Sequence, residues 1–249
     1  MAFTDRFAGV AREYASYRPG YPDALFAWLA SIAPARDVAW DCGAGNGQAS
    51  VGLAAHFARV IATDASATQV AHATPHPAVE YRVAPAEASG LPDDSVDLVT
   101  VAQAAHWFDL PRFFAEARRV ARPKGVVALW TYNLLETGVP AIDGMVTRFY
   151  AETLAAWWSP ERRLVDENYR SIVFPFAEIT APPFEMRTRW TLEQLLGYLR
   201  TWSAVDRYRR ETGDDPVSPL GAALRAEWGD PALAREIAWP LAFRVGRVP

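Results

Sequence analysis

The chain contains few of the residues that would mark it as secreted, membrane-spanning or nucleic-acid-binding. Among its 249 residues, Cys42 is the only cysteine and Lys124 the only lysine. A single cysteine cannot form an internal disulfide, and no apolar run approaches the roughly 20 residues that span a bilayer. The formal net charge is −4, and residues of both signs are scattered along the chain. Nucleic acid and membrane are therefore not expected as partners.

The first twenty residues, MAFTDRFAGVAREYASYRPG, lack the apolar core of a signal peptide. We therefore expect a cytoplasmic protein, and the preference for arginine and alanine indicates a GC-rich bacterial source. Apolar residues make up 51% of the chain, enough for the core of one large α/β domain with a small accessory part. A monomer or a weak homodimer is expected.

The fold class follows from alternating strand-like and helix-like segments. Strand-like runs occur in DVAWDCG, RVIATDAS, VEYRV, SVDLVTVA and VVALWTYN. Because helix-length segments separate them, they predict βαβ crossovers and an α/β fold with a doubly wound, mostly parallel sheet. FEMRTRWT and EIAWPLAFRVGRV add two strands, which predict an antiparallel end to a seven-stranded sheet. We also expect one helix over residues 111–125 and one long amphipathic helix over 192–211.

A glycine turn follows the first predicted strand. In DCGAGNGQAS, Gly43, Gly45 and Gly47 occupy alternate positions. A dinucleotide-binding turn has the spacing G-x-G-x-x-G and holds a pyrophosphate at the helix N-terminus, but here the third glycine comes one residue early. The carboxylate of Asp41 would also repel a diphosphate and suit a cationic ligand. The turn therefore favours S-adenosylmethionine, with a nicotinamide dinucleotide as the alternative.

Acidic residues after the next two strands fit an adenosine-containing ligand. Asp64 ends the second strand about twenty residues after the turn, where an acid binds ribose hydroxyls. Ala86 and Glu87 leave the third strand where an adenine edge would lie. Structural interpretations remain open, since Asp64 could cap the following helix and Glu87 could be a solvated loop residue.

The order of these motifs resembles a known family. WDCGAGNGQAS, ATDAS, AEASGLPDDSVDLVTVAQAAHWFD and RRVARPKGVVALW resemble the successive motifs of class I S-adenosylmethionine-dependent methyltransferases over residues 38–131. YRPGYPDALFAWL and AQAAHWFD are similar to the small-molecule branch that includes trans-aconitate and cantharidin methyltransferases. The resemblance implies a Rossmann-like fold, S-adenosylmethionine as methyl donor, S-adenosylhomocysteine as product and no metal. It also implies a small organic acceptor, for which O-methylation of a carboxylate is one option; a cofactor-binding protein without methyl transfer is the alternative.

The resemblance also implies which residues hold the cofactor. It assigns the methionine part to the turn and to a glutamine, and the ribose and adenine to residues after the second and third strands. The complete expected set is Tyr17, Arg18, Asp41, Gly43, Ala44, Gly45, Asn46, Gly47, Asp64, Ala65, Ala86, Glu87, Gln103, His106 and Trp107.

His106 is the candidate catalytic residue, because it follows the fourth strand at the edge where the cofactor is expected. It could act as a general base, orient a ligand by hydrogen bonds, or pack. The remaining histidines have no metal-site spacing. Aromatic and cationic residues form the expected acceptor site: Tyr14, Tyr21, Trp107, Phe108, Arg148, Trp157 and Tyr169. Arg162, Arg163 and Arg207 are further cations of this region, and each arginine taken singly is more often a solvated helix charge.

We expect four parts in the chain. Residues 1–36 form an N-terminal helical segment that covers the cofactor site, and residues 37–134 form the Rossmann-like cofactor-binding core. Residues 135–175 form a helical cap, and residues 176–249 complete the sheet and add helices.

Overall fold

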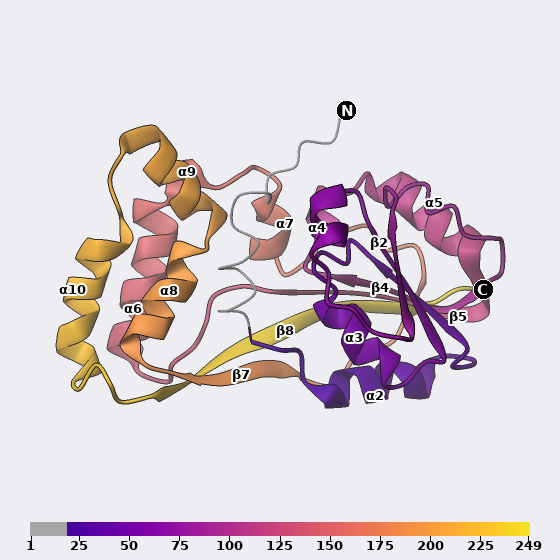
Figure 1. The fold of residues 1–249 in the computed structure, drawn as a ribbon, viewed down its shortest axis with the longest axis horizontal. Coiled ribbons are helices and arrows are strands. Elements are labelled where there is room, and N and C mark those ends of the chain that lie inside the picture. Colours follow the sequence, from indigo (N-terminus) through magenta and orange to yellow (C-terminus); the bar gives the residue numbers. More distant parts are fainter. Residues whose placement is uncertain (1–18) are drawn as a thin grey trace.

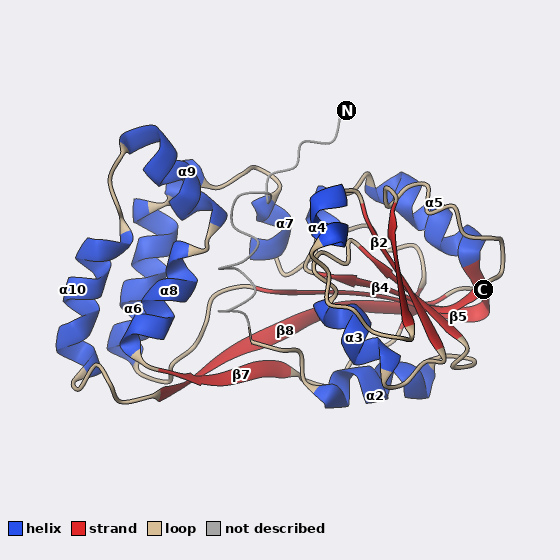
Figure 2. Ribbon diagram, in the orientation of Figure 1, coloured by secondary structure: helices blue, strands red, loops and turns tan. Residues whose placement is uncertain are grey.

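The computed structural model describes residues 19–249, which form two lobes joined by a long pair of strands (Figure 1). One lobe is a twisted sheet with helices on both faces, and the other is a group of helices at the far end of the strand pair (Figure 2). Tyr14, Tyr17 and Arg18 lie outside the described residues.

Five parallel strands form the first part of the sheet, in the order β3-β2-β1-β4-β5. Their bounds are β1 Val38–Cys42, β2 Arg59–Asp64, β3 Val79–Val83, β4 Val96–Ala102 and β5 Ala121–Tyr132. The central strand β4 is buried from Val96 to Val101, because helices cover both faces of the sheet. The order reverses between β1 and β4, and ligands bind at such a point in doubly wound sheets.

The last strand, β8 (Arg235–Arg247), gives the sheet its antiparallel end. Its second half pairs with β5, and the short strand β6 (Ala177–Glu178) pairs with its last residues. Its first half leaves the sheet and pairs with β7 (Glu185–Trp190). The predicted fold class, a doubly wound, mostly parallel sheet with an antiparallel end, is confirmed; β6 is a strand beyond the seven expected, so the described residues contain eight.

Within residues 19–249, the helices that cover the sheet are α2 (Asp23–Ile32), α3 (Gln48–Ala54), α4 (Ala67–Ala71) and α5 (Leu110–Val120). The helix expected over residues 111–125 is shorter, because α5 ends at Val120 and β5 begins at the next residue. Pro123 disfavours a helical conformation at the residue before it, and Lys124 has a φ of 66°. The chain therefore turns directly from the helix into the strand.

The second lobe is helical and draws its core from two distant parts of the sequence. It comprises α6 (Pro140–Arg148), the π-helix η2 (Phe149–Thr153), η3 (Ala155–Trp157), α8 (Leu192–Arg200), α9 (Ser203–Thr212) and α10 (Val217–Trp228). Trp228 and Trp239 are fully buried in it, with Trp190 and Tyr198 beside Trp239. The short helix α7 (Arg162–Asp166) lies between the lobes (Figure 1).

The prediction of a single helix over residues 192–211 is wrong, because α8 and α9 are separated at Thr201 and Trp202. The Thr201 hydroxyl donates to the carbonyl of Tyr198 at 2.7 Å, which ends α8. Trp202 is extended, with φ −67° and ψ 134°, and its ring contacts those of Phe149 and Trp158. Packing of this tryptophan thus overrides a continuous helical pattern.

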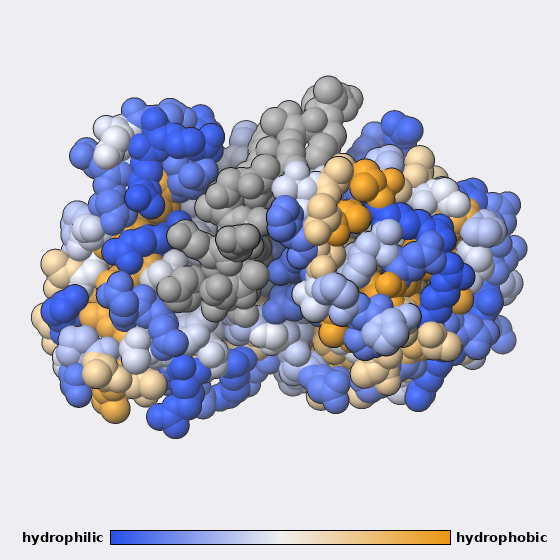
Figure 3. All heavy atoms as spheres, in the orientation of Figure 1, coloured by the Kyte–Doolittle hydropathy of each residue, from blue (hydrophilic) through white to orange (hydrophobic). Residues whose placement is uncertain are grey.

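Hydrophilic residues dominate the face of both lobes in Figure 3, and apolar residues are gathered in small patches. Within residues 19–249, no helix has the length and apolar character needed to cross a bilayer.

Candidate functional site

The glycine turn lies at the carboxyl end of β1, at the point where the strand order reverses. Gly43, Gly45 and Gly47 have φ values of 69°, 56° and 86°, which side chains rarely adopt. The backbone N–H groups of Gly43 and Ala44 donate to the carbonyl of Thr63 on β2, at 2.8 and 3.0 Å. The turn is therefore fixed to the neighbouring strand.

Two of the glycines are also required by close packing. A Cβ at Gly43 would lie 2.7 Å from the Cβ of Ala104 and 3.0 Å from the ring of Phe108. A Cβ at Gly47 would overlap the hydroxyl of Tyr81. The turn thus lies directly against the loop after β4 on one side and against β3 on the other, leaving no room for a side chain at Gly43 or Gly47.

Asp64 connects the end of β2 with the glycine turn. Its Oδ2 accepts from the N–H of Gly45 and its Oδ1 from the N–H of Ser66, both at 2.8 Å. Ser66 itself caps α4 by accepting from the N–H of Gln69 at 3.2 Å. Ala65, which lies between Asp64 and Ser66 in the sequence, is half-buried. The carboxylate is therefore held at the edge of the sheet beside the turn.

Asp41 lies beneath the turn and is fully buried. Its carboxylate accepts from the hydroxyls of Ser50 at 2.5 Å and Thr100 at 2.9 Å. Burial raises the pKa of Asp41 from 3.8 to about 6, although these two hydrogen bonds oppose the increase. The structure directs this carboxylate into the sheet and joins α3 and β4 through it.

Because its pKa is higher in the folded protein than in the unfolded chain, ionised Asp41 destabilises the fold as the pH rises from 3.8 to above 6. The cost is about 3 kcal/mol at neutral pH. We expect Asp41→Asn to increase the melting temperature relative to the parent more at pH 7.5 than at pH 4.5. The exposed Asp214→Asn serves as control in the same thermal unfolding series, and a gain independent of pH would contradict the prediction.

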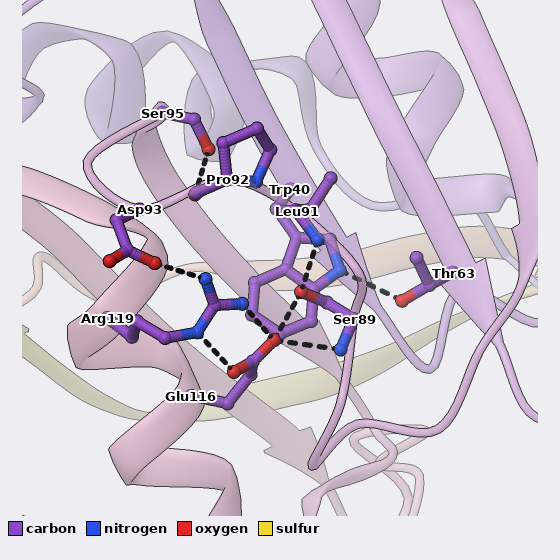
Figure 4. Close-up of polar contacts among 9 residues, drawn as sticks. All are labelled: Trp40, Thr63, Ser89, Leu91, Pro92, Asp93, Ser95, Glu116 and Arg119. Carbon is purple, nitrogen blue, oxygen red and sulfur yellow. Dashed lines mark hydrogen bonds and ion pairs between the residues drawn. The ribbon is translucent and has the colours of Figure 1, made fainter.

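The loop after β3 carries Ala86 and Glu87 and is anchored to α5 (Figure 4). The carboxylate of Glu116 accepts from the backbone N–H and the hydroxyl of Ser89, at 2.8 and 2.5 Å. The Arg119 guanidinium beside it lowers the pKa of Glu116 to about 2. Ala86 is buried, and Glu87 accepts from the N–H of Asp109 at 2.8 Å. Both therefore have fixed positions beyond the end of β3.

Gln103 joins the carboxyl ends of β4 and β5. Its Oε1 accepts from the Thr131 hydroxyl at 2.6 Å and from the N–H of Tyr132 at 2.9 Å, and its Nε2 donates to the Tyr132 carbonyl at 3.1 Å. Its φ is 56°, in the left-handed region that costs a non-glycine residue strain. The strain is sustained by these three hydrogen bonds, which keep the side chain on β5.

His106 lies in the short 3₁₀ helix η1 (Ala105–Trp107) and is 8% exposed. Its Nδ1 is hydrogen-bonded to the hydroxyl of Tyr169 at 3.1 Å, and its ring lies 4.6 Å from that of Trp107. Burial, together with the positive charge of Arg162, lowers the pKa of His106 to about 3. The imidazole is neutral at physiological pH and is a weak base.

The structure gathers part of the expected acceptor set around His106. Tyr169 is fully buried against it, and Trp107 is 38% exposed beside it. Phe108 packs on Phe113 behind the glycine turn, with ring centroids 5.1 Å apart. These aromatic rings lie together at the end of β4.

The remaining expected residues lie in several parts of the structure. Tyr21 packs edge-on against Trp130, with ring centroids 5.5 Å apart. Trp157 contacts Tyr208 within the helical lobe, and Arg148 is exposed on α6. Asn46 is half-buried within the glycine turn. Among residues 19–249, no group of three or more His, Cys, Asp or Glu side chains could hold a metal ion.

Arg162 is the residue that sequence reasoning did not distinguish from its neighbours. Its Nε donates to the hydroxyl of Tyr150 at 3.0 Å and lies 3.5 Å from Oδ1 of Asp166. Its Nη2 donates to Oδ1 of Asn133 at 3.4 Å, and its guanidinium carbon lies 4.9 Å from the centre of the Trp158 ring. Asn133 directly follows β5, so this arginine lies where the two lobes meet.

A doubly wound sheet with a glycine turn after β1 and an acid at the end of β2 defines a class of cofactor-binding enzyme fold. Comparison with known proteins identifies it further: residues 40–129 match the family described as "Methyltransferase domain". The chain belongs to the class I S-adenosylmethionine-dependent methyltransferases.

The similarity to known proteins extends beyond the sheet. The chain is 53% identical to a provisionally named type II methyltransferase from Anaeromyxobacter dehalogenans, whose solved structure matches with a TM-score of 0.87 over 93% of this chain and 98% of that one. It is 38% identical to a provisionally named methyltransferase from Dictyostelium discoideum, over 89% of this chain and 86% of that protein. An uncharacterized methyltransferase from Schizosaccharomyces pombe is 31% identical over 78% of this chain and 77% of its own length. The likeness to the first two includes most of the helical lobe.

Proposed function

We propose that the protein transfers the methyl group of S-adenosylmethionine to a small organic acceptor, with a carboxylate as the group methylated. The observation that carries the proposal is the glycine turn, whose backbone is tied to the Asp64 carboxylate by the N–H of Gly45 at 2.8 Å. A side chain at Gly43 or Gly47 would overlap neighbouring residues, so these two positions of the turn require glycine.

These residues fit the cofactor. The turn would hold the methionine part against its backbone, and Asp64 would accept hydrogen bonds from the ribose hydroxyls. Ala86, on the anchored loop after β3, would lie against the adenine. When bound, the cofactor would supply a methyl carbon whose bond to the cationic sulfur breaks as the acceptor oxygen attacks, the electron pair leaving with S-adenosylhomocysteine.

The properties of His106 support a carboxylate acceptor. A phenol or an ammonium group must lose a proton before or during methylation, and a base with a pKa of about 3 accepts that proton poorly. A carboxylate is already ionised at neutral pH and needs no base. His106 would therefore orient a ligand, and the aromatic rings beside it would exclude water from the reacting atoms.

The test is a calorimetric titration of the purified protein with S-adenosylhomocysteine and, separately, with NAD. We expect binding of the first alone. Methyl-labelled S-adenosylmethionine is then incubated with pooled small carboxylic acids, phenols and amines, and label is expected in base-labile esters from the acid pool. Failure to bind S-adenosylhomocysteine would overturn the proposal, and label confined to the phenols or amines would overturn its carboxylate part.

Substitution of Asp64 tests the ribose assignment. We expect Asp64→Ala to weaken S-adenosylhomocysteine binding about 10- to 100-fold, since hydrogen bonds to a charged group contribute about 1.5–3 kcal/mol. Asp64→Asn retains one acceptor oxygen, so its loss should be smaller. Calorimetry measures both, and an unchanged affinity in the alanine variant would remove Asp64 from the cofactor site.

A further inference from the structure

We propose that Arg162 binds the carboxylate of the methyl acceptor and thereby selects anionic acceptors over neutral ones of the same shape. The inference rests on the proposed function and adds a residue and a selection rule to it. Four kinds of observation carry it: how the guanidinium is fixed, which of its donors are engaged, where it lies, and how it differs from the arginine next to it.

Several contacts hold the guanidinium. Tyr150 and Trp158 lie together beside it, with the guanidinium carbon 5.4 and 4.9 Å from their ring centres. The two rings also lie 4.6 Å from each other, and Nε1 of Trp158 donates to the Tyr150 carbonyl at 3.1 Å. The side chain of Arg162 is only 21% exposed. An arginine held in this way loses little conformational freedom when it binds a ligand.

The engaged donors lie mainly on one edge of the guanidinium. Nε donates to Tyr150, whose hydroxyl in turn donates to Asp166. Nη2 donates to Asn133 at 3.4 Å, and within residues 19–249 no hydrogen bond or ion pair engages Nη1. The Nη1–Nη2 edge is the planar pair of donors that matches the two oxygens of a carboxylate.

The negative charge of Asp166 does not prevent Arg162 from binding a carboxylate. Its carboxylate lies 3.5 Å from Nε, on the edge away from Nη1, and its side chain is 42% exposed. Solvent screens an ion pair with so exposed a partner, so Asp166 chiefly holds the Nε edge in place through Tyr150. The opposite edge of the guanidinium remains positively charged.

The position of Arg162 fits an acceptor beside the cofactor. Asn133, its partner, follows the last residue of β5, and Gln103 is hydrogen-bonded to that same residue, Tyr132. The helix α7, which carries Arg162, contacts η1, which carries His106, and the charge of Arg162 contributes to the lowered pKa of His106. A carboxylate between them would neutralise the guanidinium and face the neutral imidazole, with the partly exposed Trp107 as an apolar wall.

The neighbouring arginine shows what an ordinary helix charge looks like here. Arg163 is 75% exposed and lies 3.5 Å from Glu167, four residues later, in the same spacing as Arg162 and Asp166. It has no ring contact or hydrogen bond that fixes its guanidinium among the described residues. Arg163→Gln is therefore a matched control for Arg162→Gln.

The test measures binding of acids and their neutral amides to the full chain saturated with S-adenosylhomocysteine. Benzoate, cinnamate and hexanoate are compared with benzamide, cinnamamide and hexanamide by calorimetry. We expect the parent to bind at least one acid more tightly than its amide. Arg162→Gln should weaken that acid about 10- to 100-fold and leave the amide unchanged, whereas Arg163→Gln should alter neither.

Further readouts separate this role from a structural one. Arg162→Lys retains the charge without the planar fork, so it should recover part of the lost acid affinity. Equal acid affinities in the two glutamine variants, or no acid preferred over its amide by the parent, would overturn the proposal while S-adenosylhomocysteine still binds. Should the parent not bind S-adenosylhomocysteine, the proposed function itself fails. If the parent binds S-adenosylhomocysteine and Arg162→Gln does not, Arg162 is a structural residue and its role in selecting the acceptor is overturned.

Discussion

Gly43→Ala is expected to weaken S-adenosylhomocysteine binding by at least about 100-fold. The added Cβ would lie 2.7 Å from the Cβ of Ala104, at a residue whose φ is 69°. The left-handed conformation costs alanine about 1–2 kcal/mol, and the contact with Ala104 forces the turn or the loop after β4 to move. Either movement displaces backbone that would face the cofactor. Calorimetric titration with S-adenosylhomocysteine measures the loss.

Gly138→Ala separates backbone strain from the effect of the turn. Gly138 has a φ of 71°, nearly that of Gly43, but a Cβ there would meet no atom within 4 Å. This variant should lose a similar amount of stability to strain while its affinity for S-adenosylhomocysteine stays within about twofold. Equal losses of affinity in the two variants would show that the contact between the turn and Ala104 does not matter for the cofactor.

His106→Ala is expected to lower turnover about 100-fold and to change the affinity for S-adenosylhomocysteine by less than about tenfold. The imidazole is fixed by Tyr169 at 3.1 Å and packs at a tilt against Trp107, so its removal leaves the acceptor poorly oriented. A misplacement of about 1 Å can cost a factor of 10² in rate. Turnover with labelled S-adenosylmethionine, combined with calorimetry, measures the two effects separately.

The pH dependence distinguishes orientation from base catalysis. Burial lowers the pKa of His106 to about 3, so the histidine does not titrate between pH 5.5 and 8.5 and the parent should show no step in rate from it there. Tyr169→Phe removes the hydrogen bond to Nδ1 and should lower turnover less than His106→Ala does. A step in rate near pH 6.5 that is present in the parent and absent in His106→Ala would show that His106 acts as a general base. Full activity of His106→Ala would show that His106 contributes only to packing.

The sheet could be predicted because its signals are local. The run from Val96 to Val101 is mostly apolar, as expected of a strand covered on both faces, and all six residues are buried. The glycines of the turn lie between a predicted strand and a predicted helix. The position of Asp64 beside Gly45 follows from the same pattern, since the carboxyl ends of adjacent parallel strands meet at one edge.

The helical lobe depends on contacts that no local pattern contains. Its core joins residues near 140–158 with residues near 190–239, and the break at Trp202 follows from rings contributed by Phe149 and Trp158. For the same reason the sequence cannot separate Arg162 from Arg163. Both are followed four residues later by an acid, and only tertiary packing buries the first and leaves the second exposed.

The long strand β8 has a consequence for how the protein is made. Its first half pairs with β7 beside the helical lobe and its second half pairs with β5 in the sheet. It leaves the ribosome after every other helix and strand of residues 19–249. The edge of β5 that faces away from β4 therefore stays unpaired until synthesis has passed residue 247. Neither lobe can reach its final pairing earlier, and nascent chains that stop before β8 should require chaperones to avoid joining edge to edge.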